Sequence, residues 1–224
     1  MSPYESLVAR ATADPRVVGL VLTGSLARGL ATERSDADVL VIVGARAEPW
    51  AHSTRTPELD TIVVTTGELA DVSDRWQRYA FRGARVLLDR LGGRIAALVH
   101  AQATLTPAER DTLVREQLDG YLNFVYRAGK NRRDGHDDLA RLEEIEAVPW
   151  LLWTLFALHW RVRPYNKYLR WELETHPLPA PWTAGFLIPA LLDRPTALAG
   201  QVMALARAEG FGDLIDEWPQ LTAP

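Results

Sequence analysis

The order of secondary-structure signals along the chain constrains its fold more than any other feature. Short apolar runs of strand length occur within the first 90 residues, whereas the rest of the sequence carries helical spacing. Strands that come first and helices that follow predict an α+β fold rather than alternating β–α units. We therefore expect an α+β domain at residues 1–91 and an all-helical C-terminal domain at residues 92–224, divided near Gly92-Gly93.

The N-terminal part is expected to form one sheet with helices around it. Its predicted strands lie at residues 17–22, 36–43, 58–64 and 85–89. Its predicted helical segments lie at residues 4–13, 26–31 and 67–79. Residues 45–57 contain two prolines and lack periodicity, so they are read as a loop.

The C-terminal part begins with a strong helix signal. Thr106 is a suitable N-cap, Pro107 suits the first helical position, and Glu109 completes a capping box. Gly129 is the expected end of this helix. Pro149 is expected to kink or split the next one. Further helices are predicted at about 136–161, 165–175, 183–192 and 196–209.

Composition excludes several kinds of protein. The chain has 224 residues, a formal net charge of −4 and no cysteine. The charge argues against a broad basic face for nucleic acid, and the missing thiols exclude disulfides and Cys-ligated zinc. The N-terminus has no signal-peptide pattern, and the most apolar stretch, residues 147–160, is shorter than the roughly 20 residues of a membrane span. We predict a cytoplasmic protein without a membrane partner.

Three aspartates occupy positions where strands seldom carry acids. Asp36 and Asp38 stand two residues apart at the start of an apolar strand, so both side chains leave the same face. Asp60 lies inside the next predicted strand. Carboxylates gathered on one face repel each other unless a cation neutralises them, and oxygen ligands favour Mg²⁺ or Mn²⁺. A turn, a protected sheet edge or a salt bridge would explain such acids equally well without a metal.

A phosphate-binding turn is predicted ahead of these acids. Gly24-Ser25 follows an apolar strand and opens a short helix, and Gly29 comes four residues after Ser25. Such a turn offers backbone N–H groups to a phosphate, and glycine permits a close approach. A phosphate turn followed by paired carboxylates is typical of metal-assisted phosphoryl chemistry.

The pattern from Gly24-Ser25 through Ser35-Asp36-Ala37-Asp38 to Asp60 resembles the polymerase-β-type nucleotidyltransferase superfamily. The resemblance covers residues 17–64, and the order of elements agrees to about residue 90. It implies a mixed sheet flanked by helices. The helical tail makes the chain similar to the aminoglycoside and lincosamide nucleotidyltransferases, which confer antibiotic resistance.

The resemblance also implies roles for the motif residues. Asp36 and Asp38 would bind two metal ions, Mg²⁺ or Mn²⁺, and Asp60 would be a third ligand or the base that faces the acceptor hydroxyl. Nucleotide-binding positions would be Gly24, Ser25, Gly29 and Ser35, all in or beside the motif. The tail would complete the nucleotide and acceptor sites.

Two features of the tail add candidates. Lys167 lies in a basic and aromatic segment and is one of only two lysines, so we predict that it contacts a nucleotide phosphate, although a solvated helix face is the plainer interpretation. Glu144 and Glu146 belong to an acidic stretch that is typical of a solvated helix start. Either glutamate could replace Asp60 as the base.

These inferences predict a metal-dependent enzyme that moves a nucleoside monophosphate from an NTP, ATP being expected, to a hydroxyl of a small molecule and releases pyrophosphate. The resemblance suggests an aminoglycoside-like antibiotic as one candidate acceptor, but no residue pattern identifies the acceptor. The alternatives are a protein-modifying (AMPylating) nucleotidyltransferase of a toxin–antitoxin type and a catalytically silent nucleotide-binding domain. The sequence leaves the oligomeric state open.

Overall fold

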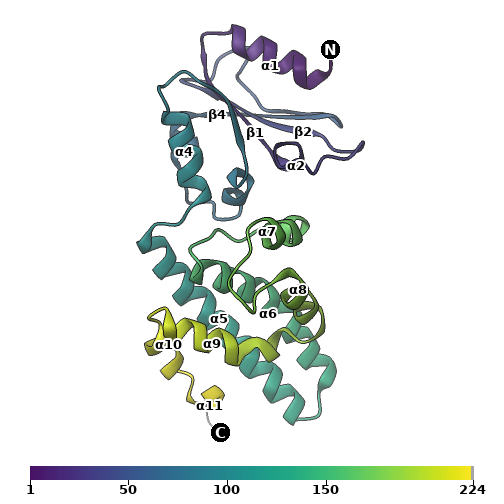
Figure 1. The fold of residues 1–224 in the computed structure, drawn as a ribbon, viewed down its shortest axis with the longest axis vertical. Helices are drawn as coiled ribbons and strands as arrows, with labels where there is room; N and C mark the ends of the chain where they lie inside the picture. The colour runs from purple at the N-terminus through teal and green to yellow at the C-terminus, as the bar shows by residue number, and fades with distance from the viewer. Residues whose placement is uncertain (223–224) are drawn as a thin grey trace. The chain divides into compact units, whose positions relative to one another are not determined.

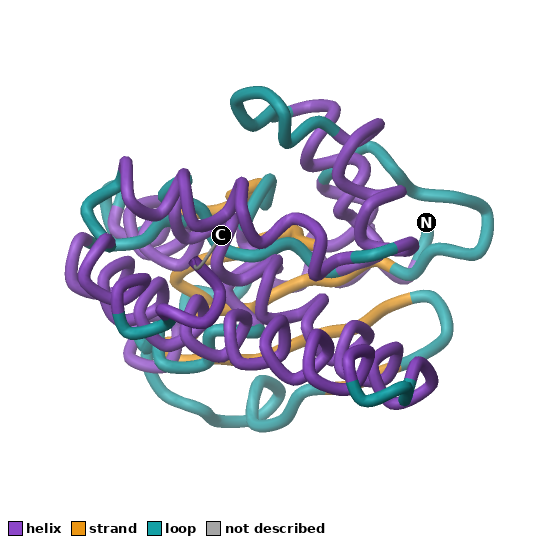
Figure 2. Tube along the Cα trace, turned by 90° about the horizontal axis from the view of Figure 1, so that it is seen from below, coloured by secondary structure: helices purple, strands orange, loops and turns teal. Residues whose placement is uncertain are grey.

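The computed structural model describes residues 1–222, which form two compact units divided between Thr104 and Leu105. The first unit contains a five-stranded sheet in the order β3-β4-β2-β1-β5, whose strands are orange in Figure 2. Strands β2 and β4 pair in parallel and the other neighbours pair antiparallel. The bounds are β1 Val17–Thr23, β2 Ala37–Val43, β3 Thr54–Arg55, β4 Leu59–Thr65 and β5 Arg85–Asp89. The predicted α+β class with a mixed sheet and a helical C-terminal part is confirmed.

Both faces of the sheet are covered, because side chains alternate along each strand. On one face, Val39 and its odd-numbered neighbours pack with Leu7 of α1 (Pro3–Ala13). On the other face, Leu40 and Ile42 pack with Ile95 of α4 (Arg94–Ala103). Figure 1 shows α1 and α4 on their two sides of the sheet. The even-numbered residues of β2, Asp38 among them, therefore belong to the α4 face.

Helix α4 belongs to the first unit, so the division lies after Thr104 rather than at the predicted 91/92 boundary. Hydrogen bonds hold α4 there in addition to its apolar contacts. Buried Arg78 donates to the carbonyl oxygens of Ala101 and Gln102, each at 3.0 Å, and to that of Thr104. The side chain of Gln102 donates in turn to the carbonyl oxygen of Leu69 at 2.8 Å. The Gly92-Gly93 signal thus marks a turn into α4.

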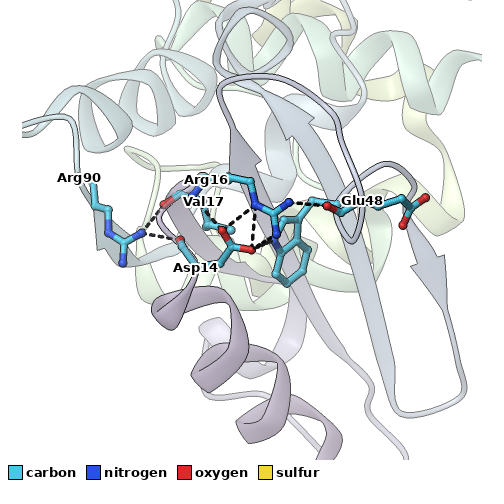
Figure 3. A network of polar contacts seen from close by, with 6 residues as sticks. Asp14, Arg16, Val17, Glu48 and Arg90 are labelled. Carbon is cyan, nitrogen blue, oxygen red and sulfur yellow. Dashed lines mark hydrogen bonds and ion pairs between the residues drawn. The ribbon is translucent and has the colours of Figure 1, made fainter.

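A polar network closes the start of β1 (Figure 3). Arg16 donates to the Asp14 carboxylate at 2.6 Å and to the carbonyl oxygen of Glu48. Arg90 donates to the carbonyl oxygens of Asp14 and Val17 at 2.6 and 2.8 Å. Hydrogen bonds from the side chain and backbone of Arg16 hold the pKa of Asp14 well below its ordinary range. The network joins the end of α1 to the loop that follows β2, which contains Glu48, and to the loop that follows β5, which contains Arg90.

Two predictions in this unit are wrong. Residues 45–57 contain the short strand β3, and the helix predicted at 67–79 is replaced by α3 (Thr66–Ala70) and a 3-10 helix, η1 (Gln77–Phe81). Asp71 accepts the Ser73 N–H at 2.9 Å, and Asp74 accepts the Trp76 N–H at 3.1 Å. These local bonds offer the backbone an alternative to helix, which explains the interruption.

The second unit is helical and is built on an antiparallel pair, α5 (Pro107–Arg133) and α6 (Asp137–Leu158). Arg110 near the start of α5 donates to the carbonyl oxygen of Leu158 at 3.2 Å. Arg132 near its end pairs with Glu144 at 2.6 Å. The later elements are η2 Asn166–Tyr168, α7 Leu169–Thr175, α8 Ala184–Asp193, η3 Pro195–Leu198, α9 Ala199–Ala208, α10 Gly212–Asp216 and α11 Pro219–Thr222. Within residues 1–222, no helix has the length and apolar character that crossing a membrane requires.

In the helical unit, the predicted end of the first helix is wrong, and so is the predicted split of the second helix at Pro149. Helix α5 continues through Gly129 to Arg133, and the left-handed residue after it is Gly135 at φ +84°. Helix α6 runs through Pro149 as one helix, so it is not split there, and the alternative of a kink stays a prediction. A proline in a helix costs about 3 kcal/mol. The apolar residues that α6 buries beyond it, including Leu151 and Phe156, offset that cost.

Candidate functional site

Four side chains form one row across the sheet of the first unit. Thr23 of β1 is the register partner of Asp38 in β2, Asp38 is the partner of Asp60 in β4, and Asp60 is the partner of Arg55 in β3. Register partners on adjacent strands present their side chains on the same face. The pairing of β2 with β4 therefore brings together two aspartates that lie 22 positions apart in the sequence.

The predicted glycine turn lies directly against the first of these acids. Gly24 begins the short helix α2 (Gly24–Ala27) at φ +67°, and a Cβ added there would lie 1.8 Å from Oδ2 of Asp38. Only glycine fits this position, because it tolerates the left-handed conformation and leaves room for the carboxylate. The structure thus brings Gly24 and Asp38 together, with Ser25 buried next to them.

Arg28 braces this turn. Its guanidinium donates to the carbonyl oxygens of Gly24 and Tyr79, each at 2.8 Å, and lies over the Tyr79 ring at 5.1 Å from the centroid. A four-residue helix has little stability of its own, so such anchoring matters. Sequence reasoning missed Arg28, although its position four residues after Gly24 places it within reach of the turn.

The third acid forms an ion pair. The Nε and Nη2 atoms of Arg55 lie 3.0 and 2.5 Å from Oδ2 of Asp60. The arginine side chain is 80% exposed and the aspartate side chain only 8%. The hydrogen bond to Asp60 raises the pKa of Arg55, and the charges of Asp36 and Asp38 raise it further. One guanidinium thus lies in the field of all three predicted acids. Sequence reasoning missed Arg55, because it read β3 as loop.

Gly29 and Ser35 have local structural roles. Gly29 follows α2 at φ +71°, and apart from Gly29 and its two chain neighbours, no atom of residues 1–222 lies within 4 Å of the point where a Cβ would be. The Ser35 side chain accepts the Thr32 N–H at 2.9 Å and so closes the turn before Asp36. Their predicted contacts with a nucleotide stay predictions.

The candidates from the tail lie in the helical unit. Lys167 is exposed in η2, with Nζ 5.2 Å from the Tyr168 ring centroid. Glu144 is 1% exposed and accepts hydrogen bonds from Arg132 at 2.6 Å and Thr196 at 2.8 Å, whereas Glu146 is exposed. Burial opposes ionisation of Glu144, but these bonds outweigh it and lower the pKa of its carboxyl group. Glu144 therefore has a structural role, as the link between α5, α6 and η3.

Some of the carboxylates in this site are suitable ligands for a divalent metal ion. Within residues 1–222, no three or more Asp, Glu or His side chains are grouped so as to hold a metal ion. Asp60 is turned to Arg55 instead. Mg²⁺ usually takes one or two carboxylates and completes its shell with phosphates and water. The Asp36 and Asp38 pair, next to the Gly24 turn, fits that requirement, and the metal-ligand roles of all three aspartates stay predictions.

Comparison with known proteins identifies the class. The sequence matches the nucleotidyltransferase domain family over residues 7–173, more than half of the chain. The chain belongs to this family and is a nucleotidyltransferase. Among solved structures, it is similar to a nucleotidyltransferase-like protein from Exiguobacterium sibiricum 255-15, at 13% identity and a TM-score of 0.48, over 95% of this chain and 77% of the other. No curated protein matches it.

Proposed function

We propose that this nucleotidyltransferase moves a nucleoside monophosphate from ATP to a hydroxyl of a small molecule, with a divalent metal ion and with release of pyrophosphate. The observation that carries the proposal is the contact between the Asp38 carboxylate and the Gly24 backbone. It brings the carboxylate that we propose as a metal ligand next to the turn that we propose as the phosphate-binding element.

The motif residues have separate roles in this proposal. Asp36 and Asp38 would hold Mg²⁺ or Mn²⁺, which when bound neutralises charge on the triphosphate and on the leaving pyrophosphate. The backbone of Gly24 and Ser25 orients the phosphates for in-line displacement. Asp60 is either a third ligand or the acceptor of the hydroxyl proton. Most of the catalysis then comes from positioning and electrostatics.

The acceptor is proposed only as a small hydroxylated molecule. An aminoglycoside or lincosamide acceptor, and with it a role in antibiotic resistance, stays a prediction from resemblance. The acidic stretch that contains Glu144 and Glu146 adds little support for a polycationic acceptor, because the charge of Glu144 is already matched by Arg132 and Arg141 at 2.6 and 3.3 Å.

Incubation of the protein with α-labelled ATP, Mg²⁺ and a panel of hydroxylated acceptors tests the proposal. Pyrophosphate release and an adduct heavier by one nucleoside monophosphate are the expected results. Asp38→Asn should lower transfer by about 10³-fold, since a metal ion supplies several kcal/mol of charge stabilisation.

Asp216→Asn is the matched control, because Asp216 is an exposed carboxylate in α10 that pairs with Arg207. This variant should transfer at the rate of the unchanged protein. Full transfer by folded Asp38→Asn would contradict the proposed mechanism.

A further inference from the structure

The helical unit contains a pocket of about 780 Å³, and none of the motif residues Asp36, Asp38 and Asp60 lines it. Its walls come from α6, from η2 and the segment that leads into it, from α7 and from α8. The volume lies within the range of about 300–1,000 Å³ that is usual for small-molecule sites. The lining is Arg141, Glu144, Ile145, Val148, Pro149, Leu152, Arg163, Asn166, Lys167, Leu169, Arg170, Ile188, Leu191 and Leu192.

Half of the lining is aliphatic. These residues are Ile145, Val148, Leu152, Leu169, Ile188, Leu191 and Leu192. Two of them are unusually exposed for their type: Ile145 is 52% and Leu192 71% accessible to solvent. Burial of aliphatic carbon contributes about 25 cal/mol per Å², so a ligand with an apolar body would gain from covering these side chains.

The charged part of the lining is cationic. Among residues 1–222, it contains Arg141, Arg163, Lys167 and Arg170 and a single carboxylate, that of Glu144. That carboxylate is already matched, since Arg132, which lies outside the pocket, pairs with it at 2.6 Å. The lining thus has four basic side chains against one acidic side chain, while Arg141 also pairs with Glu144 at 3.3 Å and Arg170 pairs with Glu174, outside the pocket, at 3.4 Å.

Arg163 is the most buried of these four basic side chains. It is 6% exposed, donates to Oδ1 of Asn166 at 3.0 Å, and lies 5.7 Å from the Trp153 ring centroid. Burial lowers its pKa, which means that the surroundings oppose its charge. An anion next to the guanidinium would offset that desolvation.

We propose that this pocket, named here the cationic pocket, binds a small amphipathic anion: an aliphatic or alicyclic body that carries an anionic head group. The aliphatic wall would cover the body, and Arg163, Lys167 and Arg170 would bind the head group. Within the part of the chain that the structure describes, no aromatic side chain lines the pocket for a nucleobase to stack on. Its charge is of the wrong sign for a polycation. The inference does not depend on nucleotidyl transfer.

Calorimetric titration of the full chain with octanoate tests the proposal, with octylammonium as the probe of reversed charge and glutarate as the anion without an apolar body. Only octanoate should bind well. Lys167→Glu should weaken octanoate binding about tenfold, since charge-assisted contacts contribute on the order of one such factor. Leu192→Ala should weaken it by a similar factor through lost burial.

The chain supplies its own control, because Lys130 is the only other lysine and is exposed on α5 outside the pocket. Lys130→Glu should leave octanoate binding within about twofold of the unchanged protein. Lys167 and Leu192 are exposed, so both variants should fold, and circular dichroism checks this. Equal binding of octylammonium, or octanoate binding that Lys167→Glu leaves intact, would overturn the proposal.

ATP with Mg²⁺ is the last probe, because the sequence predicts that Lys167 contacts a nucleotide phosphate, whereas the present proposal assigns Lys167 to the anionic head group instead. We expect ATP to leave octanoate binding unchanged. If ATP displaced octanoate in proportion to its own occupancy, the pocket would belong to the nucleotide and the assignment to an amphipathic anion would be wrong.

Discussion

At the scale of single residues, the site depends on a glycine, Gly24, that has no side chain to occupy the space next to Asp38. Gly24 has a positive φ and its Cα faces the Asp38 carboxylate, whereas Gly29 has nearly the same φ, +71° against +67°, with open space around it. The two glycines thus separate two requirements of the backbone. Position 29 requires glycine only for its left-handed conformation. Position 24 requires glycine for the same conformation and also because a side chain there would collide with Asp38.

We predict that Gly24→Ala and Gly29→Ala each lose about 1 kcal/mol of stability from the left-handed backbone. Gly24→Ala should in addition displace the Asp38 carboxylate and lower nucleotidyl transfer at least about tenfold relative to Gly29→Ala. Thermal unfolding and the transfer assay measure the two effects. Equal activity of the two variants would show that the contact with Asp38 does not matter for transfer.

The ion pair of Arg55 and Asp60 makes a second prediction. If Asp60 is a metal ligand, Arg55 competes with the ion, since both seek the same carboxylate. Arg55→Gln should then tighten Mn²⁺ binding about fivefold, the equivalent of the ~1 kcal/mol of an exposed ion pair. Spectroscopic titration of free Mn²⁺ measures this without any turnover.

Arg46→Gln is the control, because Arg46 forms a comparable ion pair with Glu68 at 2.9 Å in the same unit. It should leave Mn²⁺ binding unchanged. Unchanged or weaker binding in Arg55→Gln would remove Asp60 from the set of ligands and leave it the role of base.

At the scale of elements, the sequence predicted those helices and strands whose positions depend on the local pattern of apolar and polar residues. The apolar strands β1, β2, β4 and β5 appear within about a residue or two of their expected bounds, because each is a run of residues that must be buried. The motif predicted Asp36, Asp38 and Gly24 as neighbours, and the structure shows the contact of Gly24 with Asp38. The Arg55 ion pair could not be predicted, since it depends on an edge strand of two residues and on its register with β4.

The residue pattern of the sequence also did not predict how closely α5 packs against α6. A Cβ at Gly120 would lie 2.2 Å from Cε3 of Trp150. Gly120→Ala should therefore destabilise the protein by about 1–3 kcal/mol through overpacking. Gly129→Ala is its control on the same helix, because apart from the adjacent residues and the nearby backbone of α5 itself, no described atom lies within 4 Å of the new methyl group. This control should be neutral or stabilising by up to about 1 kcal/mol. Thermal unfolding that ranks the two variants in the opposite order would contradict the packing argument.

At the scale of the whole molecule, the family match and the division into units do not coincide. The match spans residues 7–173, whereas the first unit ends at Thr104. The family's domain therefore includes α5, α6 and part of α7 in addition to the sheet. The predicted acids and the glycine turn all lie in the first unit, and the cationic pocket lies in the second. Each unit thus carries a different binding function in our proposals.

This separation makes a prediction for unfolding. Because each unit has its own buried apolar residues, we expect calorimetry of the full chain to show two transitions. Gly24→Ala should lower only the transition of the first unit, and Gly120→Ala only that of the second, each by roughly 5 °C per kcal/mol for units of this size. ATP with Mg²⁺ should raise the first transition and octanoate the second, since a ligand stabilises the state that binds it. A single transition that both variants lower would mean that the two units unfold together, and the ligand shifts could then no longer be assigned to separate cores.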